Sequence, residues 1–404
     1  MKRWASWLVP VILLASLILA SCTQEPPAET SQVEKNMLPL LSPDGKHLLS
    51  LSGGKFSVST FPEQEVILNI PVKKGEVVED LLWSPQSDAF AYHARKGQRS
   101  EYGIYIVGLD GSLDKVAELE LTGPGSRQIL WSPCGRYLFW DIPFFSVYDR
   151  ETQSVLIKSE ISGHVRSPLF SKDGSKLAFT LLGDDGAENL WVMDVSTGNA
   201  RQVTQEGEGD YPFFWANDTK LFARIGAVST GGGYVYGLAA IDLGTGSREI
   251  IDAEMNDSPQ DGGTAPRVSR LNVAKSISPD GNYLIGECRT LAGTESRIYL
   301  LELATGRREV ILEGKTPAEG YGLVQCLWLE DGQAVLNVKR ESYESSNVAW
   351  QETHEVLLYS PGNDSVLLAE SPSRIDLLGV ADGRLYYVTA EDDLLRYVLL
   401  ENTE

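Results

Sequence analysis

Histidine and cysteine are both scarce in this chain of 404 residues, which contains four of each. The histidines stand far apart and never at the spacing of metal ligands, so the sequence predicts no metal site. Apart from Cys22 there are three cysteines, and an odd number excludes a complete disulfide framework. Cys288 and Cys326 could pair if they lie in neighbouring units, whereas buried free thiols are the alternative.

Basic side chains are also in short supply. The chain has 35 Lys and Arg against 56 Asp and Glu, a formal net charge of −21 that is spread along the sequence. Proteins that bind nucleic acid need a basic surface for most of their affinity, so this composition argues against nucleic acid as a partner. The excess of acidic side chains favours solubility, and the more specific alternative is that they bind a cation or a basic partner.

Only one long apolar run occurs, at the N-terminus. It extends from Leu8 to Leu19 and follows the basic residues Lys2 and Arg3. A bilayer-spanning helix needs about 20 residues, so this run is too short to span and instead fits the centre of a secretory signal peptide. The sequence therefore predicts a signal peptide over residues 1–21, and no later segment is long and apolar enough to cross a membrane.

The run ends in Leu19-Ala20-Ser21-Cys22, which resembles the bacterial lipobox. The resemblance implies cleavage before Cys22, lipid on Cys22, and anchoring in the cell membrane or outer membrane on its extracytoplasmic side. An ordinary signal peptide with a chance cysteine is the alternative. Residues 22–36 are polar and contain two prolines, so a flexible tether between the lipid and the folded part is expected.

A turn motif repeats through the rest of the chain. A short apolar run, often ending in Trp or Phe, meets a Ser-Pro-Asp-Gly-like turn, and a second apolar run follows. In such a turn Pro presets one backbone angle, Asp caps its own turn and Gly accepts a positive φ. Eight copies stand about 40 to 60 residues apart: 40–45, 82–85, 130–135, 169–174, 214–218, 278–281, 327–332 and 380–383.

Each copy belongs to a unit of four predicted strands, and units of this period form the blades of a β-propeller. We therefore predict an all-β fold, with a propeller over residues 37–404 and eight blades. Seven blades are the alternative if the first copy is shared or the degenerate fifth copy is an insertion. The last unit shows only three clear strands, and a strand from the N-terminal end could complete it and close the ring.

The Trp-Ser-Pro-Asp-Gly turn, followed by an apolar strand and a strand such as Leu190-Trp191-Val192-Met193-Asp194, resembles the TolB-type, WD40-like (PD40) propeller repeat. The resemblance covers about residues 37–402 and implies the fold. It implies little about function, because this repeat serves many purposes. The chain departs from TolB in its predicted lipidation, its larger blade number and the lack of a preceding α/β domain, so a TolB role is not implied.

The innermost strand of each blade lines the channel, and alignment on the turns brings polar residues to equivalent positions. These residues form a candidate binding site at the channel mouth, while a hydrated channel wall is the alternative. The candidate residues are Asp80, Arg127, Gln128, Arg166, Tyr211, Gln325 and Asp376.

Two loops stand out. The stretch from Ala253 to Lys275 has no counterpart in the other units and includes Arg267 and Arg270, so it is a candidate contact loop, with a tolerated insertion as the alternative. The acidic segment from Gly183 to Asn189 could bind Ca²⁺, although a plain hairpin loop is the simpler interpretation. No other cofactor is expected.

No Gly-x-Ser-x-Gly nucleophile turn occurs, which argues against a serine peptidase. The sequence therefore favours a non-enzymatic scaffold that binds another protein of the envelope or cell surface. A binding protein for a small molecule, peptide or sugar in the channel mouth is the first alternative. An enzyme that uses carboxylates such as Asp80 and Asp376 is the second.

Overall fold

The computed structural model describes residues 37–96, 101–120, 128–141, 145–158, 164–182, 186, 188–204, 210–228, 234–251, 264–267, 277–290, 295–315, 319–342, 351–391 and 395–400. These residues form strands and turns, and none of them lies in a helix. The signal peptide, Cys22 and the tether lie outside the described residues, so the predictions about them stay predictions. In the described part of the chain, no helix could cross a membrane.

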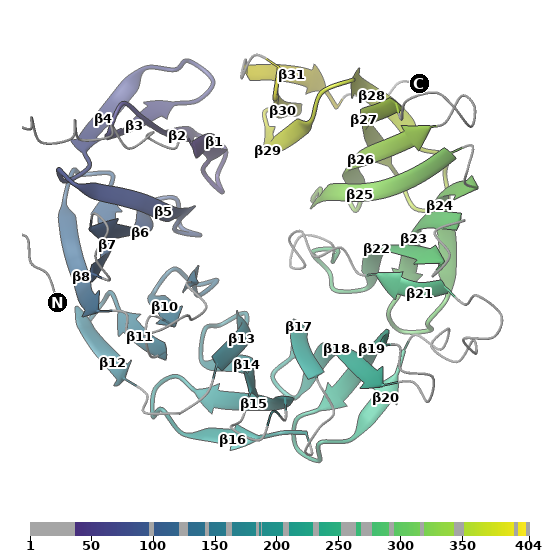
Figure 1. Cartoon of the computed structure of the whole chain (residues 1–404), viewed down its shortest axis with the longest axis horizontal. Helices are drawn as coiled ribbons and strands as arrows, with labels where there is room; N and C mark the ends of the chain where they lie inside the picture. Colours follow the sequence, from purple (N-terminus) through teal and green to yellow (C-terminus); the bar gives the residue numbers. More distant parts are fainter. Residues whose placement is uncertain are drawn as a thin grey trace, which may run out of the picture.

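The strands form eight antiparallel sheets arranged as a ring (Figure 1). In the first half of the chain the sheets are blade 1, β1 (Met37–Leu41), β2 (His47–Ser52), β3 (Lys55–Thr60) and β4 (Val66–Pro71); blade 2, β5 (Glu76–Trp83), β6 (Ala89–Lys96), β7 (Glu101–Gly108) and β8 (Leu113–Glu120); blade 3, β9 (Ile129–Trp131), β10 (Tyr137–Asp141), β11 (Phe145–Asp149) and β12 (Ser154–Lys158); and blade 4, β13 (His164–Phe170), β14 (Lys176–Leu182), β15 (Glu188–Asp194) and β16 (Ala200–Gln202).

The second half continues in the same order. Its sheets are blade 5, β17 (Asp210–Asn217), β18 (Lys220–Val228), β19 (Tyr234–Asp242) and β20 (Arg248–Ile250); blade 6, β21 (Thr264–Arg267), β22 (Tyr283–Thr290), β23 (Glu295–Glu302) and β24 (Arg308–Lys315); blade 7, β25 (Glu319–Trp328), β26 (Ala334–Ser342), β27 (Gln351–Tyr359) and β28 (Val366–Ser371); and blade 8, β29 (Ile375–Ala381), β30 (Arg384–Thr389) and β31 (Leu395–Leu399).

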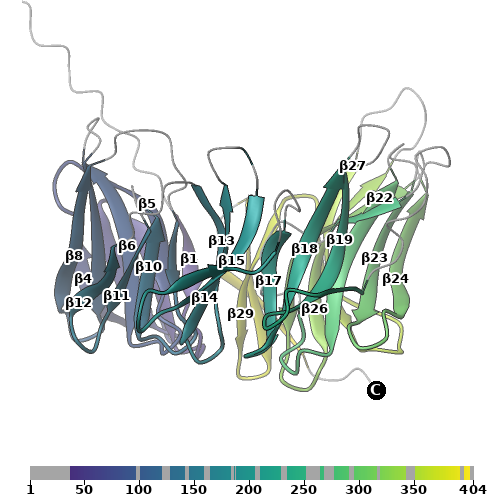
Figure 2. The same ribbon diagram turned by 90° about the horizontal axis from the view of Figure 1, so that it is seen from below.

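The prediction of eight blades is confirmed, because both the first and the fifth turn copy have a sheet of their own. Within each sheet the strands follow one another from the innermost to the outermost (Figure 1). Seen edge-on, the ring has two faces, with hairpin turns along its lower edge in Figure 2. We call the face that carries the Ser-Pro-Asp-Gly-like turns the turn face.

The repeated turn is held by its own side chains. In blade 4 the Ser171 hydroxyl donates to Asp173 over 2.7 Å and accepts the Lys176 N–H over 2.9 Å, while Gly174 has a φ of 76°. Blade 6 repeats this arrangement, with 2.6 Å between Ser278 Oγ and Asp280 Oδ1. These local bonds satisfy backbone groups that the hairpin leaves unpaired, which explains why one short sequence starts so many strand pairs.

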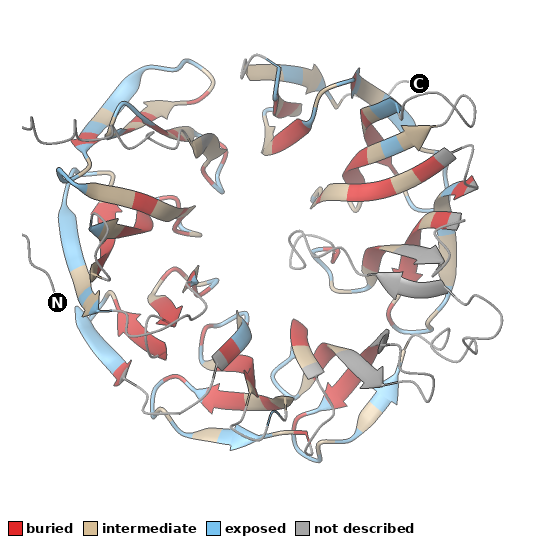
Figure 3. Ribbon diagram, in the orientation of Figure 1, coloured by how far each residue is buried: buried red, intermediate tan, exposed pale blue. Residues whose placement is uncertain are grey.

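The Trp residue before the turn packs against the preceding blade in blades 2 and 5. Trp83 and Trp215 are buried, and their indole N–H groups donate to Leu40 and Leu169 of the preceding blade over 3.0 and 3.1 Å. Figure 3 shows burial on the inner strands and exposure on outermost strands such as β8 and β12. The core is therefore divided among the interfaces between neighbouring blades.

The ring closes where blade 8 meets blade 1. The rings of Phe61 and Tyr386 pack edge to face with 4.3 Å between centroids. Blade 8 has three strands in the described part of the chain, whereas each other blade has four. The N-terminal strand that could complete it would come from residues 1–36, which lie outside the described residues.

The structure changes the expectation for the 253–275 stretch and decides between the two alternatives for Cys326. The stretch 253–275 is not wholly an irregular loop, because its residues 264–267 form β21, the innermost strand of blade 6. Arg267 lies opposite Glu287 and Ile277 lies opposite Leu284, while residues 268–276 lie outside the described residues. Cys326 is a buried free thiol, so the alternative that it pairs with Cys288 is wrong.

Candidate functional site

The predicted channel-mouth residues lie on or next to the innermost strands. Asp80, Arg166, Tyr211, Gln325 and Asp376 belong to β5, β13, β17, β25 and β29, and Gln128 directly precedes β9. Arg127, Arg270 and the side chain of Arg267 lie outside the described part of the structure. Six innermost strands, β1, β5, β13, β17, β25 and β29, carry a β-bulge. A bulge re-aims side chains, so alignment on the turns alone does not predict their neighbours.

Arg166 and Tyr211 come together on Glu188, which the sequence placed only in the candidate calcium segment. Both contact Glu188, the first residue of β15: the Arg166 guanidinium pairs with one carboxylate oxygen, and the Tyr211 hydroxyl donates to the other. Arg224, the cross-strand partner of Tyr211, lies 4.8 Å from the centre of its ring. Burial and the bond to Glu188 raise the pKa of Tyr211 above its usual value. This cluster joins blades 4 and 5.

The side chains of Gln325 and Asp376 also make hydrogen bonds to other residues of this chain. Gln325 Oε1 accepts the Leu377 N–H over 2.7 Å, which links the innermost strands of blades 7 and 8. Asp376 is buried and accepts bonds from the Arg374 guanidinium over 2.6 and 3.0 Å. These contacts give both residues a structural role at the boundary between the two blades.

Blade 2 holds a further charged group beside the channel. Glu79 stands at the bulge of β5, where its carboxylate accepts the Arg95 Nε–H over 2.8 Å and lies 3.5 Å from Nε2 of the buried His93. The neighbouring Asp80 accepts the N–H of Leu81 over 2.9 Å. In blade 3 the Gln128 N–H donates to Asp141 over 2.8 Å, while its side chain is exposed.

Metal binding has no support from this geometry. No group of three or more His, Cys, Asp or Glu side chains in the described ranges could hold an ion. Gly183, Asp184, Asp185 and Ala187 of the predicted calcium loop lie outside the described residues. Its last acidic residue, Glu188, is occupied by Arg166 and Tyr211.

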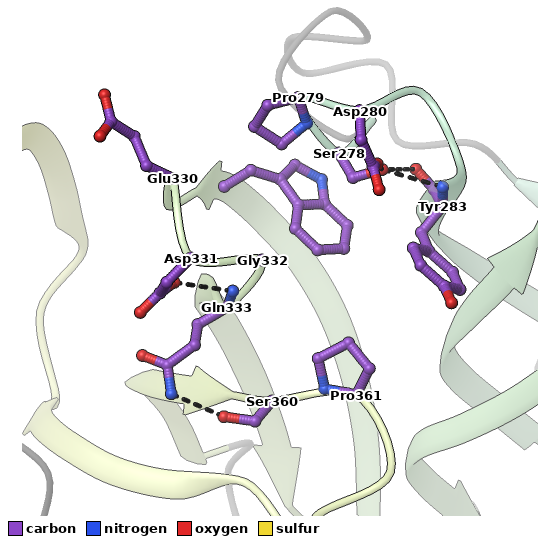
Figure 4. A pocket seen from close by; sticks show the side chains of 11 residues that line it. Ser278, Pro279, Asp280, Tyr283, Glu330, Asp331, Gly332, Gln333, Ser360 and Pro361 are labelled. Carbon is purple, nitrogen blue, oxygen red and sulfur yellow. Dashed lines mark hydrogen bonds between the residues drawn. The ribbon is translucent and has the colours of Figure 1, made fainter.

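The turn face carries an open groove between blades 6 and 7 (Figure 4). It encloses about 660 Å³ and lies between the turn after Ser278 and the turn after Trp328. We call it the blade 6–7 groove. Its lining residues are Ser278, Pro279, Asp280, Tyr283, Trp328, Glu330, Asp331, Gly332, Gln333, Ser360 and Pro361.

Among the described residues, the lining of this groove contains three carboxylates and no basic side chain. Asp280 is held by Ser278, and Asp331 accepts the Gln333 N–H over 3.0 Å, but Glu330 is exposed and makes no hydrogen bond or ion pair in the described part of the chain. The indole N–H of Trp328 is buried and has no hydrogen-bond partner there. The groove thus offers negative charge beside two aromatic rings.

A second groove lies on the other side of the blade 6 turn and encloses about 600 Å³. It shares Ser278, Pro279 and Asp280 with the first groove, yet its lining contains Lys172 and Lys220. Phe170, Phe214, Trp215 and Phe222 form its apolar part. The turn of blade 6 therefore separates an acidic groove from one with two lysines.

Sequence reasoning identified these turns but not the grooves between them. The seventh copy, Leu327–Gly332, replaces the usual Ser-Pro by Leu329-Glu330, and this departure from the repeat was the available signal. The groove itself needs two turns from different units to stand side by side, which the sequence does not show.

Comparison with known proteins gives distant likenesses. No family model matches the chain. It is 27% identical to dipeptidyl-peptidase 5 of Porphyromonas gingivalis over 172 residues, which cover 38% of this chain and 25% of that protein. It is 24% identical to antigen Lp49 of Leptospira interrogans over 270 residues, which cover 62% of this chain and 50% of that protein. The matches thus span a quarter and half of these relatives.

Solved structures with a similar chain course include propellers of several kinds. The β-propeller domain of the Trilobed protease from Pyrococcus furiosus has a TM-score of 0.49 at 11% identity, over 82% of this chain and 94% of that one. An oligogalacturonate lyase in complex with manganese has a TM-score of 0.48 at 11% identity, over 79% and 87%. TolB from Acinetobacter baumannii has 0.37 at 14% identity, over 88% and 77%. These likenesses carry no conclusion about activity.

Proposed function

We propose that this protein is a non-enzymatic interaction scaffold, held on the extracytoplasmic side of a membrane by lipid on Cys22. Its blade 6–7 groove receives a basic segment of a partner protein of the envelope or cell surface. The lipid anchor is supported by the residues around Cys22 alone. The observation that carries the binding role is the open groove whose described lining residues include three carboxylates and no basic side chain.

The chemistry of the groove favours an arginine or lysine side chain. A guanidinium or ammonium group is attracted both by carboxylates and by the faces of Trp and Tyr rings. Glu330 is exposed and makes no bond in the described part of the chain, so a partner would not have to break an existing ion pair to reach it. The net charge of −21 would also steer a basic partner towards the protein.

The polar residues of the channel mouth indirectly support the blade 6–7 groove as the binding site, because they already make contacts within the chain. Arg166 and Tyr211 contact Glu188, Asp376 contacts Arg374, and Gln325 contacts Leu377. A ligand at these positions would have to displace bonds that join the strands and blades. The blade 6–7 groove needs no such displacement.

A photocrosslinking amino acid at Glu330 in the lipidated protein, in living cells, tests the proposal. The expected result is one dominant protein, linked through a peptide rich in Lys and Arg, that is not captured from position 63. Glu63 is exposed on the β3–β4 turn of blade 1 and is the control site. Capture that is equal at the two positions would contradict the proposed site.

Charge reversal in the groove provides a second test of the proposed binding site. Glu330→Lys with Asp331→Lys should abolish capture, while Glu63→Lys with Glu65→Lys, which changes the net charge equally, should leave it intact. Raising the salt concentration should weaken capture, because the attraction is electrostatic at an open site. If the control pair lost capture as well, net charge and not the groove would be the cause.

A second candidate function rests on the Arg166–Glu188–Tyr211 cluster. Two arginines, Arg166 and Arg224, lie by the hydroxyl and ring of Tyr211, so a ligand carboxylate could take the place of Glu188. A small carboxylate or acidic sugar would then raise the melting temperature, and Arg166→Ala would remove that shift. The absence of any shift across a panel of such ligands would exclude this role.

A further inference from the structure

The turn of blade 6 stands between two shorter turns. In blade 4 the paired residues that flank the turn are separated by six residues, 171–176, and blade 6 also has six, 278–283. In blade 5 the same interval is the five residues 216–220, and in blade 7 it is the five residues 329–333. Each of these shorter turns adjoins a groove, so the turn of blade 6 has a groove on either side.

The groove beside the turn of blade 5 is not used by the proposed function. It encloses about 600 Å³ and reaches from the turn of blade 4 to the turn of blade 6. We call it the blade 5 groove. Its lining includes Lys172, Phe214, Trp215, Lys220, Phe222 and Asp280.

The blade 5 groove has an apolar part that a ligand can reach at Phe214. Trp215 and Phe222 are buried, whereas Phe214 is half-buried and lies with 6.4 Å between its ring centroid and that of Phe222. A Cβ at Gly281 would lie 3.3 Å from the Phe214 ring, so this ring rests against the turn of blade 6. An aromatic or aliphatic side chain packed on Phe214 would lose apolar surface to water-free contact, which favours binding.

Two lysines give the blade 5 groove a positive charge in a chain whose net charge is −21. Lys172 is exposed and makes no hydrogen bond or ion pair in the described part of the chain. Lys220 Nζ lies 3.4 Å from Glu249, whose side chain is 70% exposed, and such a surface pair is weak enough for a ligand to replace it. The carboxylate of Asp280 accepts hydrogen bonds from its own turn. Two positive charges against one negative charge favour an anionic group here.

We propose that the blade 5 groove binds an aromatic or aliphatic side chain with a carboxylate beside it, on the same partner segment whose basic residue enters the blade 6–7 groove. Charge complementarity assigns the carboxylate to Lys172 and Lys220, and Phe214 receives the apolar side chain. This extension of the partner segment rests on the proposed function.

Continuity between the two grooves favours a protein segment as the occupant. Both grooves are lined by Ser278, Pro279 and Asp280, so a chain that leaves one groove crosses the turn of blade 6 directly into the other. A small molecule would fit in either groove alone. A chain segment can occupy both grooves and match their opposite charges.

Selection of a random peptide library on phage against the full chain, purified in detergent, tests the proposal. We expect peptides in which Phe, Trp or Leu stands next to Asp or Glu, at a recurrent distance from Lys or Arg. Lys172→Glu with Lys220→Glu should remove the apolar–acidic feature and keep the basic one. Lys55→Glu with Lys74→Glu, at exposed lysines of β3 and of the link between β4 and β5, changes the net charge equally and should select the same peptides as the parent protein.

Fluorescence anisotropy with one selected peptide measures the size of the effect. Lys172→Glu with Lys220→Glu should raise its Kd about tenfold, because two attractive charges become repulsive. Phe214→Ala should also raise the Kd, whereas the Lys55→Glu, Lys74→Glu control should leave it unchanged. Melting temperatures equal to that of the parent protein show that the variants are folded.

The proposal is overturned if the parent protein selects no apolar–acidic feature, or if the Lys172→Glu, Lys220→Glu variant still selects it. Binding of naphthalene-1-acetate without selection of any peptide would also overturn it, because the occupant would then be a small carboxylate.

The same selection separates this proposal from the proposed function. Glu330→Lys with Asp331→Lys should remove only the basic feature. Peptides that carry the basic feature alone would overturn the proposal made here and leave the proposed function standing. Peptides that carry the apolar–acidic feature alone would contradict the proposed function and, with it, the joint occupancy of the two grooves.

Discussion

Gln325 bridges to the backbone of Leu377 across the boundary between blades 7 and 8. Its Oε1 accepts the Leu377 N–H over 2.7 Å, and its Nε2 donates to the Leu377 carbonyl over 3.4 Å. Beside it, Asn337 Nδ2 donates to the carbonyl of Ile375 over 2.6 Å. Two side-chain amides thus take the place of strand pairing between neighbouring blades, and this holds the innermost strands in register.

Replacement of Asn337 by Ala should destabilise the fold. Asn337 is fully buried, and without its amide the Ile375 carbonyl loses its donor, which costs about 1–3 kcal/mol. Urea denaturation measures this loss of unfolding free energy. Gln128→Ala, at an exposed side chain, is the control and should change stability little. Equal stability of the two variants would show that the amide bridge is dispensable.

Replacement of Ser171 by Ala should weaken one turn without touching the blade 6–7 groove. The Ser171 hydroxyl serves both Asp173 and the Lys176 N–H, and its loss leaves that N–H without a partner. The expected cost is about 1–2 kcal/mol, read as a lower urea midpoint. Ser154→Ala, at an exposed site on β12, is the comparison. An unchanged midpoint would mean that the backbone bonds of the hairpin suffice.

The turn aspartates predict a particular dependence of stability on pH. Hydrogen bonds from Ser171 and Ser278 lower the pKa of Asp173 and Asp280 below their usual values. The two carboxylates therefore stabilise the fold above the unfolded-state pKa of about 3.9, and this contribution disappears as pH falls through the lowered folded-state pKa.

Asp173→Asn with Asp280→Asn should accordingly flatten the loss of stability in acid. The measurement is the unfolding free energy in urea at a series of pH values between neutral and acid. Asp218→Asn, at an exposed turn position, keeps the steeper parent profile. Identical slopes in all three proteins would contradict the role of these hydrogen bonds.

Glu188→Gln should lower the pKa of Tyr211. Burial and the Glu188 carboxylate both raise it in the parent protein, and the substitution removes only the charge, so the pKa should fall partway towards its usual value. Ultraviolet titration detects the tyrosinate. Subtracting the profile of Glu188→Gln with Tyr211→Phe isolates this residue among sixteen tyrosines. An unchanged or higher pKa would mean that the Glu188 carboxylate does not raise it in the parent protein.

Cys22→Ala should release the protein from membranes. If lipid on Cys22 is the anchor, the protein moves to the soluble fraction when cells are broken, and labelled fatty acid no longer enters it. Cys134→Ala should stay with the membrane fraction. A Cys22→Ala protein that remained membrane-bound would place the anchor elsewhere.

The eight-bladed ring could be predicted because the repeat is local. The Ser-Pro-Asp-Gly turn is stabilised by hydrogen bonds between its own residues, such as Ser171 and Asp173. Each copy in the sequence therefore predicts a pair of strands. Likewise, the burial of Trp83 between blades follows from an apolar residue placed at a fixed distance from the turn. Regular spacing was enough to count blades.

The channel-mouth site could be predicted only in part. Arg166 and Tyr211 were identified, yet Glu188, which joins them, belongs to a different strand position and carries no repeat signal. The bulges in the innermost strands shift pairing by a residue, so positions aligned on the turn do not share neighbours.

The sequence by itself determined the turns, the strands and the number of blades, because each depends on residues a few positions apart. Only the tertiary structure decided which polar side chains meet, as Gln325 meets Leu377, and where the acidic groove between Asp280 and Glu330 opens. These relationships join residues about 50 positions apart in neighbouring blades. They depend on how the sheets pack around the ring, which no local pattern encodes.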